Sequence, residues 1–386
     1  MQKIALMGQI HNDGLKILED SKFNIIEISN FSYENLRKEL NDVEAIALRM
    51  AELPREILQE CKSLKIVSRH GVGYDNVDLN YLNKNKIALA VTGSSNAVTV
   101  AEHVMAMFLN LCKLSKTSDQ LVRSGQFDSK ASMQKDMLEL YKRNIFIVGF
   151  GRIGKTLAKR CIAFESNIFV YDPYIESNTI KAHNCTPVSF DEGIKIADFI
   201  SLHLPINEKT KYLISKKELS QMKKTCILVN TARGGIIKED DLAWALKNKI
   251  IHSAGLDVFE QEPPENDNPL FALDNLILSP HSSALTLACR KRMAIETCKN
   301  IVNYLNRSSD LILSNIVNKD IFSSKPDSTY IYSNGWHYKA IYSVIIGFIF
   351  SASTIWNVDL RFLQSYSWII GAFATYITYY LLAYRQ

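Results

Sequence analysis

The chain has 386 residues, of which 47% are hydrophobic and 22% are charged, and its formal net charge is +5. This length is sufficient for two compact domains and a further segment, at roughly 150 residues per domain. Lysines and arginines are interspersed with nearly as many carboxylates and form no basic stripe, so no nucleic-acid partner is expected.

Two series of short apolar runs alternate with helical patterns. The first series predicts strands over 3–8, 24–29, 45–49, 65–71 and 87–92, with helical spacing around 16–20 and 54–64. A long helix with apolar residues three and four positions apart begins at Val98. The second series predicts strands over 144–148, 167–172, 198–205, 226–231, 253–259 and 276–281. Such alternation is typical of βαβ units and predicts two successive α/β blocks with parallel sheets.

The seven cysteines are widely spaced and form neither a CxxC pair nor a cluster with histidines. This pattern indicates buried free thiols in a reducing compartment, and it predicts no metal site. The first residues, MQKIALMG, lead directly into a predicted strand. We therefore expect no signal peptide and a main body that lies in the cytoplasm.

A glycine-rich motif, GFGRIG, lies between a predicted strand and a predicted helix. Gly149 permits a tight turn, Gly151 lets the backbone approach a pyrophosphate, and Gly154 allows the helix to pack closely on the strand. The positive end of the helix then faces the phosphates. A structural glycine turn is the alternative reading.

The strand after this helix ends in Asp172, about 20 residues downstream of the motif. An acid at this distance binds the adenosine ribose hydroxyls of a dinucleotide and repels a 2′-phosphate. The sequence therefore predicts NAD as the cofactor in preference to NADP. In the alternative reading, Asp172 only caps a turn before Pro173.

Three polar residues follow predicted strands of the second series: Arg233 in NTARGGII, Glu262 in GLDVFEQEPP and His281 in LSPHSSALT. Ligands of open α/β sheets bind beyond the carboxyl ends of the strands, so these residues can converge on one cleft. Each also has a plain structural reading. In that interpretation Arg233 is a surface arginine, Glu262 is part of an exposed acidic loop, and His281 is a residue at the start of a helix after Pro280.

At these motifs the chain resembles the D-isomer-specific 2-hydroxyacid dehydrogenase family, which includes phosphoglycerate dehydrogenases. The resemblance runs from about Lys3 to Val317, with motifs in family order: SRHGVGYDNVD, VAEHVMAMFL, VGFGRIGK, SLHLP, NTARGGII, AGLDVFEQEP and SPH. It implies NAD-dependent hydride transfer between a small D-2-hydroxy acid and a 2-keto acid. It also implies a homodimer formed through the nucleotide domain.

The resemblance implies roles that agree with the chemistry of the side chains. Arg233 would bind the substrate carboxylate by paired hydrogen bonds, His281 would exchange the proton, and Glu262 would orient His281 and raise its pKa. Relatives that oxidise formate lack the histidine–glutamate pair, so its presence favours a hydroxy acid. The implied cofactor contacts are Gly149, Gly151, Arg152, Ile153, Gly154, Asp172, His203, Pro205, Thr231, Ala232, Arg233, Asp257 and His281. The implied substrate contacts are Arg49, Val72, Gly73, Arg233 and His281.

More than one interpretation remains open for some of these positions. The resemblance implies that Asp257 contacts the nicotinamide carboxamide. In the alternative interpretation, Asp257 only terminates a strand. His103 is expected to be a packed helix residue, and His203 is expected to line the cofactor cleft without transferring a proton. Arg49 resembles a basic position near the substrate of phosphoglycerate-specific relatives. Since no cluster for a phosphate is evident, we expect a 2-hydroxy acid without specifying which one.

The family topology implies two Rossmann- or flavodoxin-like domains with a cleft between them. Residues 1–97 and 285–317 would form the substrate domain, and residues 98–284 the NAD-binding domain inserted between these segments. The hinge region would lie at Asn96 and Val100–His103. Closure of the cleft would exclude water from the path of the hydride.

The resemblance ends near Val317, and a polar linker over 318–338 precedes two uncharged runs, 340–358 and 365–384. As helices these runs would be about 28–30 Å long, which matches a hydrocarbon core, and tyrosine and tryptophan near their ends favour the headgroup region. We therefore expect a two-helix transmembrane hairpin within 339–385, in contact with a lipid bilayer. Lys339 and Arg385 would flank it on the cytoplasmic side.

A helical hairpin packed on the soluble body is the alternative for this tail. For the whole chain, the leading hypothesis is a membrane-tethered dehydrogenase. A non-enzymatic NAD(H)-sensing membrane scaffold is the alternative, and a third reading makes the hairpin an assembly module of a membrane complex.

Overall fold

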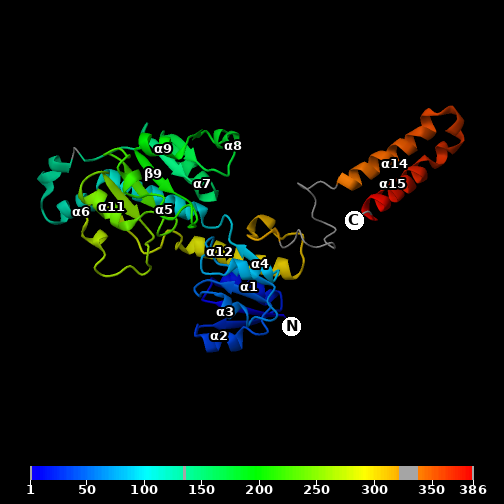
Figure 1. Ribbon diagram of the computed structural model, residues 1–386, viewed down its shortest axis with the longest axis horizontal. Coiled ribbons are helices and arrows are strands. Elements are labelled where there is room, and N and C mark those ends of the chain that lie inside the picture. The colour runs from blue at the N-terminus through cyan, green and yellow to red at the C-terminus, as the bar shows by residue number, and fades with distance from the viewer. Residues whose placement is uncertain (1, 134–135, 321–337, 385–386) are drawn as a thin grey trace. The chain divides into compact units, whose positions relative to one another are not determined.

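A computed structural model describes residues 2–133, 136–320 and 338–384 (Figure 1). The chain divides into two compact units, Met1–Ile321 and Phe322–Gln386. Two separate parallel β-sheets lie in the first unit, so the prediction of two parallel-sheet α/β domains is confirmed. Most of the predicted linker over 318–338, and Arg385, lie outside the described residues.

The first domain has a five-stranded sheet in the order β2-β1-β3-β4-β5. Every residue of β3 and β5 is buried, as expected for a parallel sheet with helices on both faces. Its strands are β1 (Lys3–Met7), β2 (Asn24–Ile28), β3 (Ala45–Leu48), β4 (Ile66–Arg69) and β5 (Ala88–Val91). Its N-terminal helices are α1 (Asn12–Asp20), α2 (Tyr33–Glu39), α3 (Arg55–Leu58) and α4 (Leu79–Lys84).

A helix from much later in the chain, α12 (Leu287–Leu305), completes this domain. Figure 1 shows α12, in yellow, beside α1, in blue, and the two helices are in contact. They approach so closely that a Cβ at Gly14 would lie 2.7 Å from the backbone of Ala294. The Ser68 hydroxyl of β4 donates to the carbonyl of Thr297 at 3.0 Å. The segment after α12 returns to the same sheet, where Ile316 pairs with Ala90.

The second domain has a seven-stranded sheet in the order β12-β11-β10-β9-β6-β7-β8. The chain starts at the middle of this sheet, with β6, and the strand order reverses between β6 and β9. Such a switch point is where doubly wound sheets bind their ligands. The strands are β6 (Asn144–Val148), β7 (Asn167–Tyr171), β8 (Thr186–Pro187), β9 (Phe199–Leu202), β10 (Ile227–Asn230), β11 (Ser253–Leu256) and β12 (Leu276–Leu278).

Helices cover both faces of this sheet, which explains the continuous apolar runs of its strands. One core lies under α5 and α7, and the other contains residues of α9 and α11. The helices are α5 (Ala97–Lys113), α6 (Ser115–Arg123), α7 (Arg152–Ala163), α8 (Ser177–Lys181), α9 (Phe190–Ile196), α10 (Lys216–Leu219) and α11 (Glu239–Lys247). The 3₁₀ turns of the first unit are η1 (Phe127–Met133), η2 (Pro269–Ala272) and η3 (Leu313–Asn315).

All the strands predicted from apolar runs are present. The sequence missed only β8, because a two-residue strand that contains Pro187 has no periodicity to detect. The seven cysteines are free and buried, as predicted. Burial raises the pKa of the Cys61 and Cys298 thiols to about 12, so both are protonated at neutral pH.

The second unit is a helical hairpin made of α14 (Tyr338–Trp356), η4 (Val358–Tyr366) and α15 (Ser367–Tyr384). The two α-helices pack on each other at glycines. A Cβ at Gly347 would lie 1.9 Å from the Thr375 hydroxyl and 2.6 Å from the Gly371 carbonyl. Small residues at a helix–helix contact allow this close approach.

The helices of the hairpin differ from the predicted spans in two respects. The first helix ends at Trp356, and residues 358–366 form a 3₁₀ segment. Of the described helices, α14 alone is long and apolar enough by itself to cross a membrane; the bent pair α5–α6 passes the same test only as one broken span. The second predicted span, α15, does not pass this test.

Candidate active site

The glycine-rich loop has the conformation that the motif predicts. Gly149 adopts φ +97°, and a Cβ there would lie 2.4 Å from the carbonyl oxygen of His203. Gly151 forms the N-cap of α7, and a Cβ built on it would meet nothing within 4 Å. The start of α7 is therefore open to a phosphate, and its first N–H groups have no partner within the helix. Ile153 lies in this first turn.

Asp172 follows β7 and accepts hydrogen bonds at both carboxylate oxygens. Its Oδ2 binds the backbone N–H of Phe150 at 2.8 Å, and its Oδ1 binds that of Tyr174 at 2.9 Å. The capping role that the sequence left open is thus present, and it fixes the glycine-rich loop relative to β7. Carboxylate oxygens have further lone pairs, so the ribose contact stays a prediction.

Replacing Asp172 by asparagine is expected to narrow the preference for NADH over NADPH. The amide retains an oxygen for the Phe150 N–H while it removes the charge that opposes a 2′-phosphate. The measurement is kcat/KM for both cofactors in the wild type and the variant. An unchanged ratio would leave Asp172 with its capping role alone.

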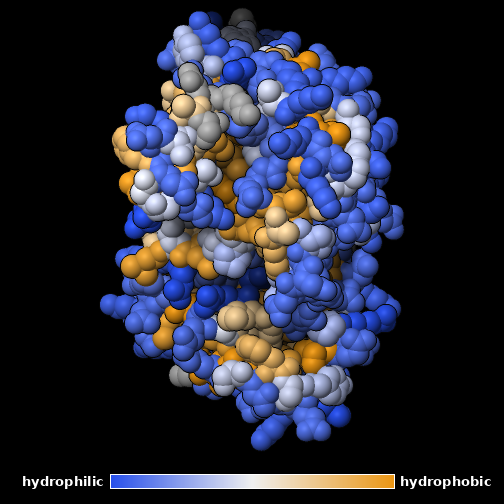
Figure 2. All heavy atoms as spheres, turned by 90° about the vertical axis from the view of Figure 1, so that its left-hand side faces the viewer, coloured by the Kyte–Doolittle hydropathy of each residue, from blue (hydrophilic) through white to orange (hydrophobic). Residues whose placement is uncertain are grey.

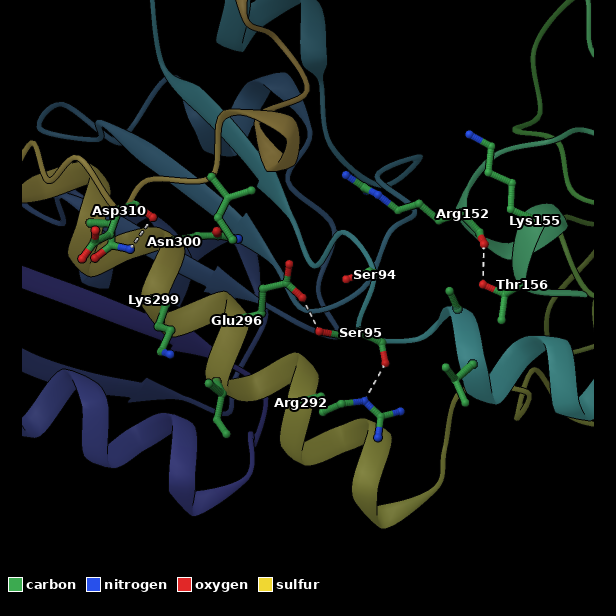
Figure 3. Close-up of a pocket in the computed structure, with 15 residues that line it drawn as sticks. Ser94, Ser95, Arg152, Lys155, Thr156, Arg292, Glu296, Lys299, Asn300 and Asp310 are labelled. Carbon is green, nitrogen blue, oxygen red and sulfur yellow. Dashed lines mark hydrogen bonds between the residues drawn. The ribbon is translucent and has the colours of Figure 1, made fainter. Parts of the chain in front are cut away.

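Arg152 is oriented toward the first domain. Its Nη2 donates to the carbonyl of Ser314 at 3.0 Å. The side chain lines a cavity of about 1010 Å³ between α7 and α12, to which Lys155, Arg292 and Glu296 also contribute (Figure 3). Arg233, Glu262 and His281 do not line this cavity. With its side chain engaged there, Arg152 can contact a cofactor through its backbone N–H at the start of α7.

Further predicted cofactor residues follow β9 and β10. The ring of His203 contacts the Ser201 hydroxyl at 2.9 Å, and burial lowers the pKa of His203 to about 3. The ring is therefore neutral, and the expectation that it transfers no proton stays a prediction. Pro205 is exposed beyond it. Thr231 is buried, and its hydroxyl has no hydrogen-bond partner among the described residues. Such an orphaned buried group fits a site that receives a polar ligand.

Glu262 and His281 meet directly. His281 Nδ1 lies 2.7 Å from Glu262 Oε2, and Glu262 Oε1 accepts the Phe259 N–H at 3.1 Å. The hydrogen bond that His281 donates to Glu262 raises the pKa of His281, against the opposing effect of burial. Burial raises the pKa of Glu262, but the hydrogen bonds from His281 and Phe259 outweigh it, so the pKa of Glu262 is lowered. Together these shifts favour an imidazolium–carboxylate pair.

The loop that carries His281 is held by a buried acid, Asp257, at the end of β11. Asp257 is fully buried, and its carboxylate accepts from the Ser279 hydroxyl at 2.6 Å and from the N–H groups of Ser282 and Ser283 at 2.8 and 3.0 Å. His281 itself adopts φ +49°, a conformation that costs about 1–3 kcal/mol for a non-glycine residue. Asp257 therefore fixes the loop that presents the imidazole.

His103, on α5, contacts this loop from outside the site. Its Nε2 lies 3.0 Å from the Ser279 hydroxyl. This is the packed position expected from the sequence. The predicted contact between Asp257 and the nicotinamide stays a prediction, since both oxygens of Asp257 are engaged by the loop.

Arg233 follows β10 and reaches across to the first domain. Its Nε donates to Asp75 Oδ2 at 2.6 Å, and its Nη1 donates to the carbonyl of Ala232 at 2.6 Å. A Cβ on Gly73 would lie only 1.4 Å from Arg233 Nη2, so the guanidinium occupies the space above that glycine. The structure thus brings Arg233 to the predicted Val72–Gly73 loop.

Arg49, the last predicted substrate contact, follows β3. Its Nη1 donates to the carbonyl of Gln9 at 2.6 Å. Burial, followed by the charge of Arg290, lowers the pKa of Arg49. Arg69 lies nearby at the end of β4, where burial and then the charge of Arg233 lower its pKa to about 10. The Val72–Gly73 loop therefore has a positive surrounding, with Asp75 as a compensating charge.

Two contributors were missed by the sequence. Asn230 bonds the Ala232 N–H at 3.0 Å and the Arg233 carbonyl at 2.8 Å, and so shapes the loop that carries Arg233. Asp75 lies within the motif SRHGVGYDNVD but carried no assigned role. Its position two residues after Gly73, a predicted substrate contact, could have indicated that Asp75 lies at the site.

Known proteins are similar to this chain in sequence and fold. The model of the D-isomer specific 2-hydroxyacid dehydrogenase NAD binding domain matches residues 105–283. A D-3-phosphoglycerate dehydrogenase of Methanocaldococcus jannaschii is 34% identical over 321 residues, which cover 82% of this chain and 60% of that protein. The chain thus spans less than two thirds of this relative.

Other relatives are matched over nearly their whole length. A glyoxylate reductase of Thermococcus litoralis is 33% identical over 84% of this chain and 99% of its own. The structure of a D-lactate dehydrogenase of Aquifex aeolicus, complexed with NAD and lactic acid, aligns with a TM-score of 0.73 and 27% identity, over 81% of this chain and 98% of that one. The cofactor of the second domain is NAD(H). The chain belongs to the D-isomer specific 2-hydroxyacid dehydrogenase family.

Proposed function

We propose that the protein is an NAD-dependent oxidoreductase that interconverts a D-2-hydroxy acid and a 2-keto acid. The observation that carries this proposal is the 2.7 Å contact between His281 and Glu262, with Arg233 close enough for its charge to affect both pKa values. A proton donor and a carboxylate receptor are the two groups that reduction of a 2-keto acid needs beyond its hydride source.

The residues present fit an NAD cofactor. The open start of α7 at Gly151 can hold the pyrophosphate, Asp172 the adenosine ribose, and the orphaned Thr231 hydroxyl a polar group of the cofactor. Bound NADH supplies the hydride. Its site lies along the carboxyl edge of the second sheet, at the switch point beside β6.

Side chains and backbone groups of this chain bind the substrate and transfer its proton. Arg233 Nη2 and the backbone N–H groups of Val72 and Gly73 bind the carboxylate and orient the carbonyl. His281 Nε2 donates its proton to the carbonyl oxygen as that oxygen gains charge, and Glu262 stabilises the imidazolium before the transfer and keeps Nδ1 engaged. In the reverse direction neutral His281 removes the hydroxyl proton.

A panel of 2-keto acids with NADH tests this function through the loss of NADH absorbance. Glyoxylate, hydroxypyruvate and a phosphorylated 2-keto acid belong in the panel, because relatives carry glyoxylate reductase, hydroxypyruvate reductase and D-3-phosphoglycerate dehydrogenase activity in their names. The positive surrounding of Arg49 and Arg69 favours a substrate with a second anionic group. A chain that binds NADH but oxidises it with no 2-keto acid would support the sensing scaffold instead.

We also propose a homodimer formed through the second domain. Apolar side chains are exposed on and after α6, among them Val122 and Phe127, which are 61% and 60% exposed. Figure 2 shows the molecule from the side on which α6 lies, where apolar patches interrupt a mainly hydrophilic surface. Covering such patches is a common reason for association.

The C-terminal hairpin is proposed to hold the enzyme on a membrane, with the catalytic domains on the cytoplasmic side. Its outward side chains are strongly apolar: Phe348, Phe373 and Leu381 are 66%, 64% and 60% exposed. A hairpin that packs on itself at Gly347 and Gly371 leaves these side chains for lipid. Trp356 and Trp368 lie at the ends of α14 and α15 that meet at η4, where an interface suits them.

Truncation is expected to separate activity from membrane attachment. A chain ending at Asp327 retains all residues assigned to the site and should be soluble and active. The full chain should sediment with membranes and resist salt and carbonate, since burial of apolar helices rather than charge retains it. Fractionation and activity assays of both chains measure this. Release of the full chain by carbonate would contradict spanning, and an insoluble truncated chain would indicate that the hairpin covers the enzyme itself.

A further inference from the structure

We propose that Asp75 is a positioning residue of the substrate site, which holds the Arg233 guanidinium from the opposite domain so that one nitrogen remains for the substrate carboxylate. This inference rests on the proposed function, because it assigns Arg233 to that carboxylate. Asp75 is in the first domain and Arg233 in the second, and the two residues are 158 positions apart in the chain.

The guanidinium is fixed at two of its three nitrogens. Nε donates to Asp75 at 2.6 Å, and Nη1 donates to the carbonyl of its neighbour Ala232 at 2.6 Å. Nη2 is the nitrogen that lies above Gly73. Since Asp75 and the Ala232 carbonyl engage the other two nitrogens, Nη2 is the nitrogen assigned to the substrate carboxylate.

Geometry distinguishes this role from a surface ion pair. Exposed ion pairs contribute little to stability, and the Asp75 side chain is 47% exposed, so the contact is not expected to act through the stability of the fold. The planar guanidinium of Arg233 has a fixed orientation because Asp75 holds its Nε, whereas the side chain of a free arginine adopts several rotamers. Asp75 Oδ2 would also lie 3.3 Å from a Cβ on Gly73, so acid, guanidinium and loop share one small volume.

The pair also links substrate binding to the approach of the two domains. Asp75 can contact Arg233 only when the loop after β4 lies against the loop after β10. The receptor for the carboxylate is therefore complete only in that arrangement. Misplacement of a binding group by about 1 Å can cost about 10²-fold in rate.

The experiment compares Asp75→Ala and Asp75→Asn in the full chain, with Asp42→Ala as a matched control. Asp42 forms an ion pair of the same 2.6 Å length with Lys3 outside the site. Asp75→Ala is expected to lower kcat/KM for the 2-keto acid by about 10–100-fold without changing the Kd of NADH. Asp75→Asn retains an oxygen for Nε and should recover most of this loss. Asp42→Ala should behave as the wild type.

Binding of oxamate, an unreactive analogue of a 2-keto acid, gives a second readout that needs no turnover. Quenching of NADH fluorescence in the enzyme–NADH complex should show weaker oxamate binding in Asp75→Ala. In an Arg233→Lys background, Asp75→Ala should add little, because the two changes affect one receptor. A wild type that binds NADH and oxamate but turns over no 2-keto acid would contradict the proposed function. The oxamate measurement would still test the role of Asp75, because it needs no turnover.

Three results would overturn the proposal. Unchanged oxamate binding in Asp75→Ala would show that Arg233 needs no positioning. Tighter oxamate binding would show that Asp75 competes with the substrate for Arg233. Equal losses of NADH binding and activity in both Asp75 variants would indicate a purely structural residue.

Discussion

Replacing His281 by alanine is expected to lower kcat for reduction of a 2-keto acid by about 10²–10⁴-fold, the usual contribution of a positioned proton donor. The imidazole is bound to Glu262 at 2.7 Å and presented by a loop that Asp257 fixes. Because His281 supplies a proton, NADH binding should change far less than kcat. Stopped-flow turnover and fluorescence titration of NADH measure the two effects separately.

His252 provides a matched control for this variant. It precedes β11, at the edge of the sheet opposite the site, and contacts the Asp136 carbonyl at 3.0 Å. His252→Ala should retain the wild-type kcat. Equal turnover in wild type and His281→Ala would remove His281 from the mechanism.

The pH dependence of kcat/KM should report the protonation of His281. Since Glu262 raises the pKa of His281, kcat/KM for reduction should be full at low pH and fall as pH rises through this raised pKa. Glu262→Gln removes the carboxylate and should move this fall to lower pH. A profile that does not move would show that Glu262 does not set the protonation of His281.

Replacing Arg233 by lysine is expected to lower kcat/KM by about 10–100-fold, equivalent to loss of one charge-assisted hydrogen bond of about 1.5–3 kcal/mol. A single ammonium cannot reach Asp75, the Ala232 carbonyl and the space above Gly73 at once. The charge is conserved, so the loss reports geometry. Initial rates over the 2-keto acid panel give the measurement.

Arg160→Lys is the matched control. Arg160 pairs with Glu102 at 2.9 Å between α7 and α5, and its side chain is 25% exposed, as is that of Arg233. We expect this variant to retain the wild-type kcat/KM. If Arg233→Lys also retained it for every substrate, another group would have to bind the carboxylate.

Local patterns predicted the strands and the cofactor loop well. Parallel strands covered on both faces must be apolar throughout, so runs such as NIFIV and CILVNT marked β6 and β10. The Glu262–His281 pair followed from two motifs that end neighbouring strands, β11 and β12. Family resemblance supplied their roles, which spacing alone left open.

Other features could not be predicted because they depend on tertiary geometry. The contact of Asp75 with Arg233 joins two domains, and no periodicity relates residues so far apart. The bonds of Asp172 to Phe150 and Tyr174 depend on how the loops fold back on β7. In the tail, the absence of charge predicted both helices correctly, whereas the close approach of Gly347 to Thr375 depends on how the two helices pack.

The contact between Gly14 of α1 and Ala294 of α12 has a consequence for the order of folding. The first sheet is complete in sequence by Val91, yet α12, which packs on α1 and β4, and Ile316, the bridge partner of Ala90, come only after residue 286. Contacts across such separations form slowly, because a long loop must close before they stabilise the fold. On the ribosome, where domains fold as units during synthesis, the inserted NAD-binding domain should therefore finish before the domain whose synthesis began first.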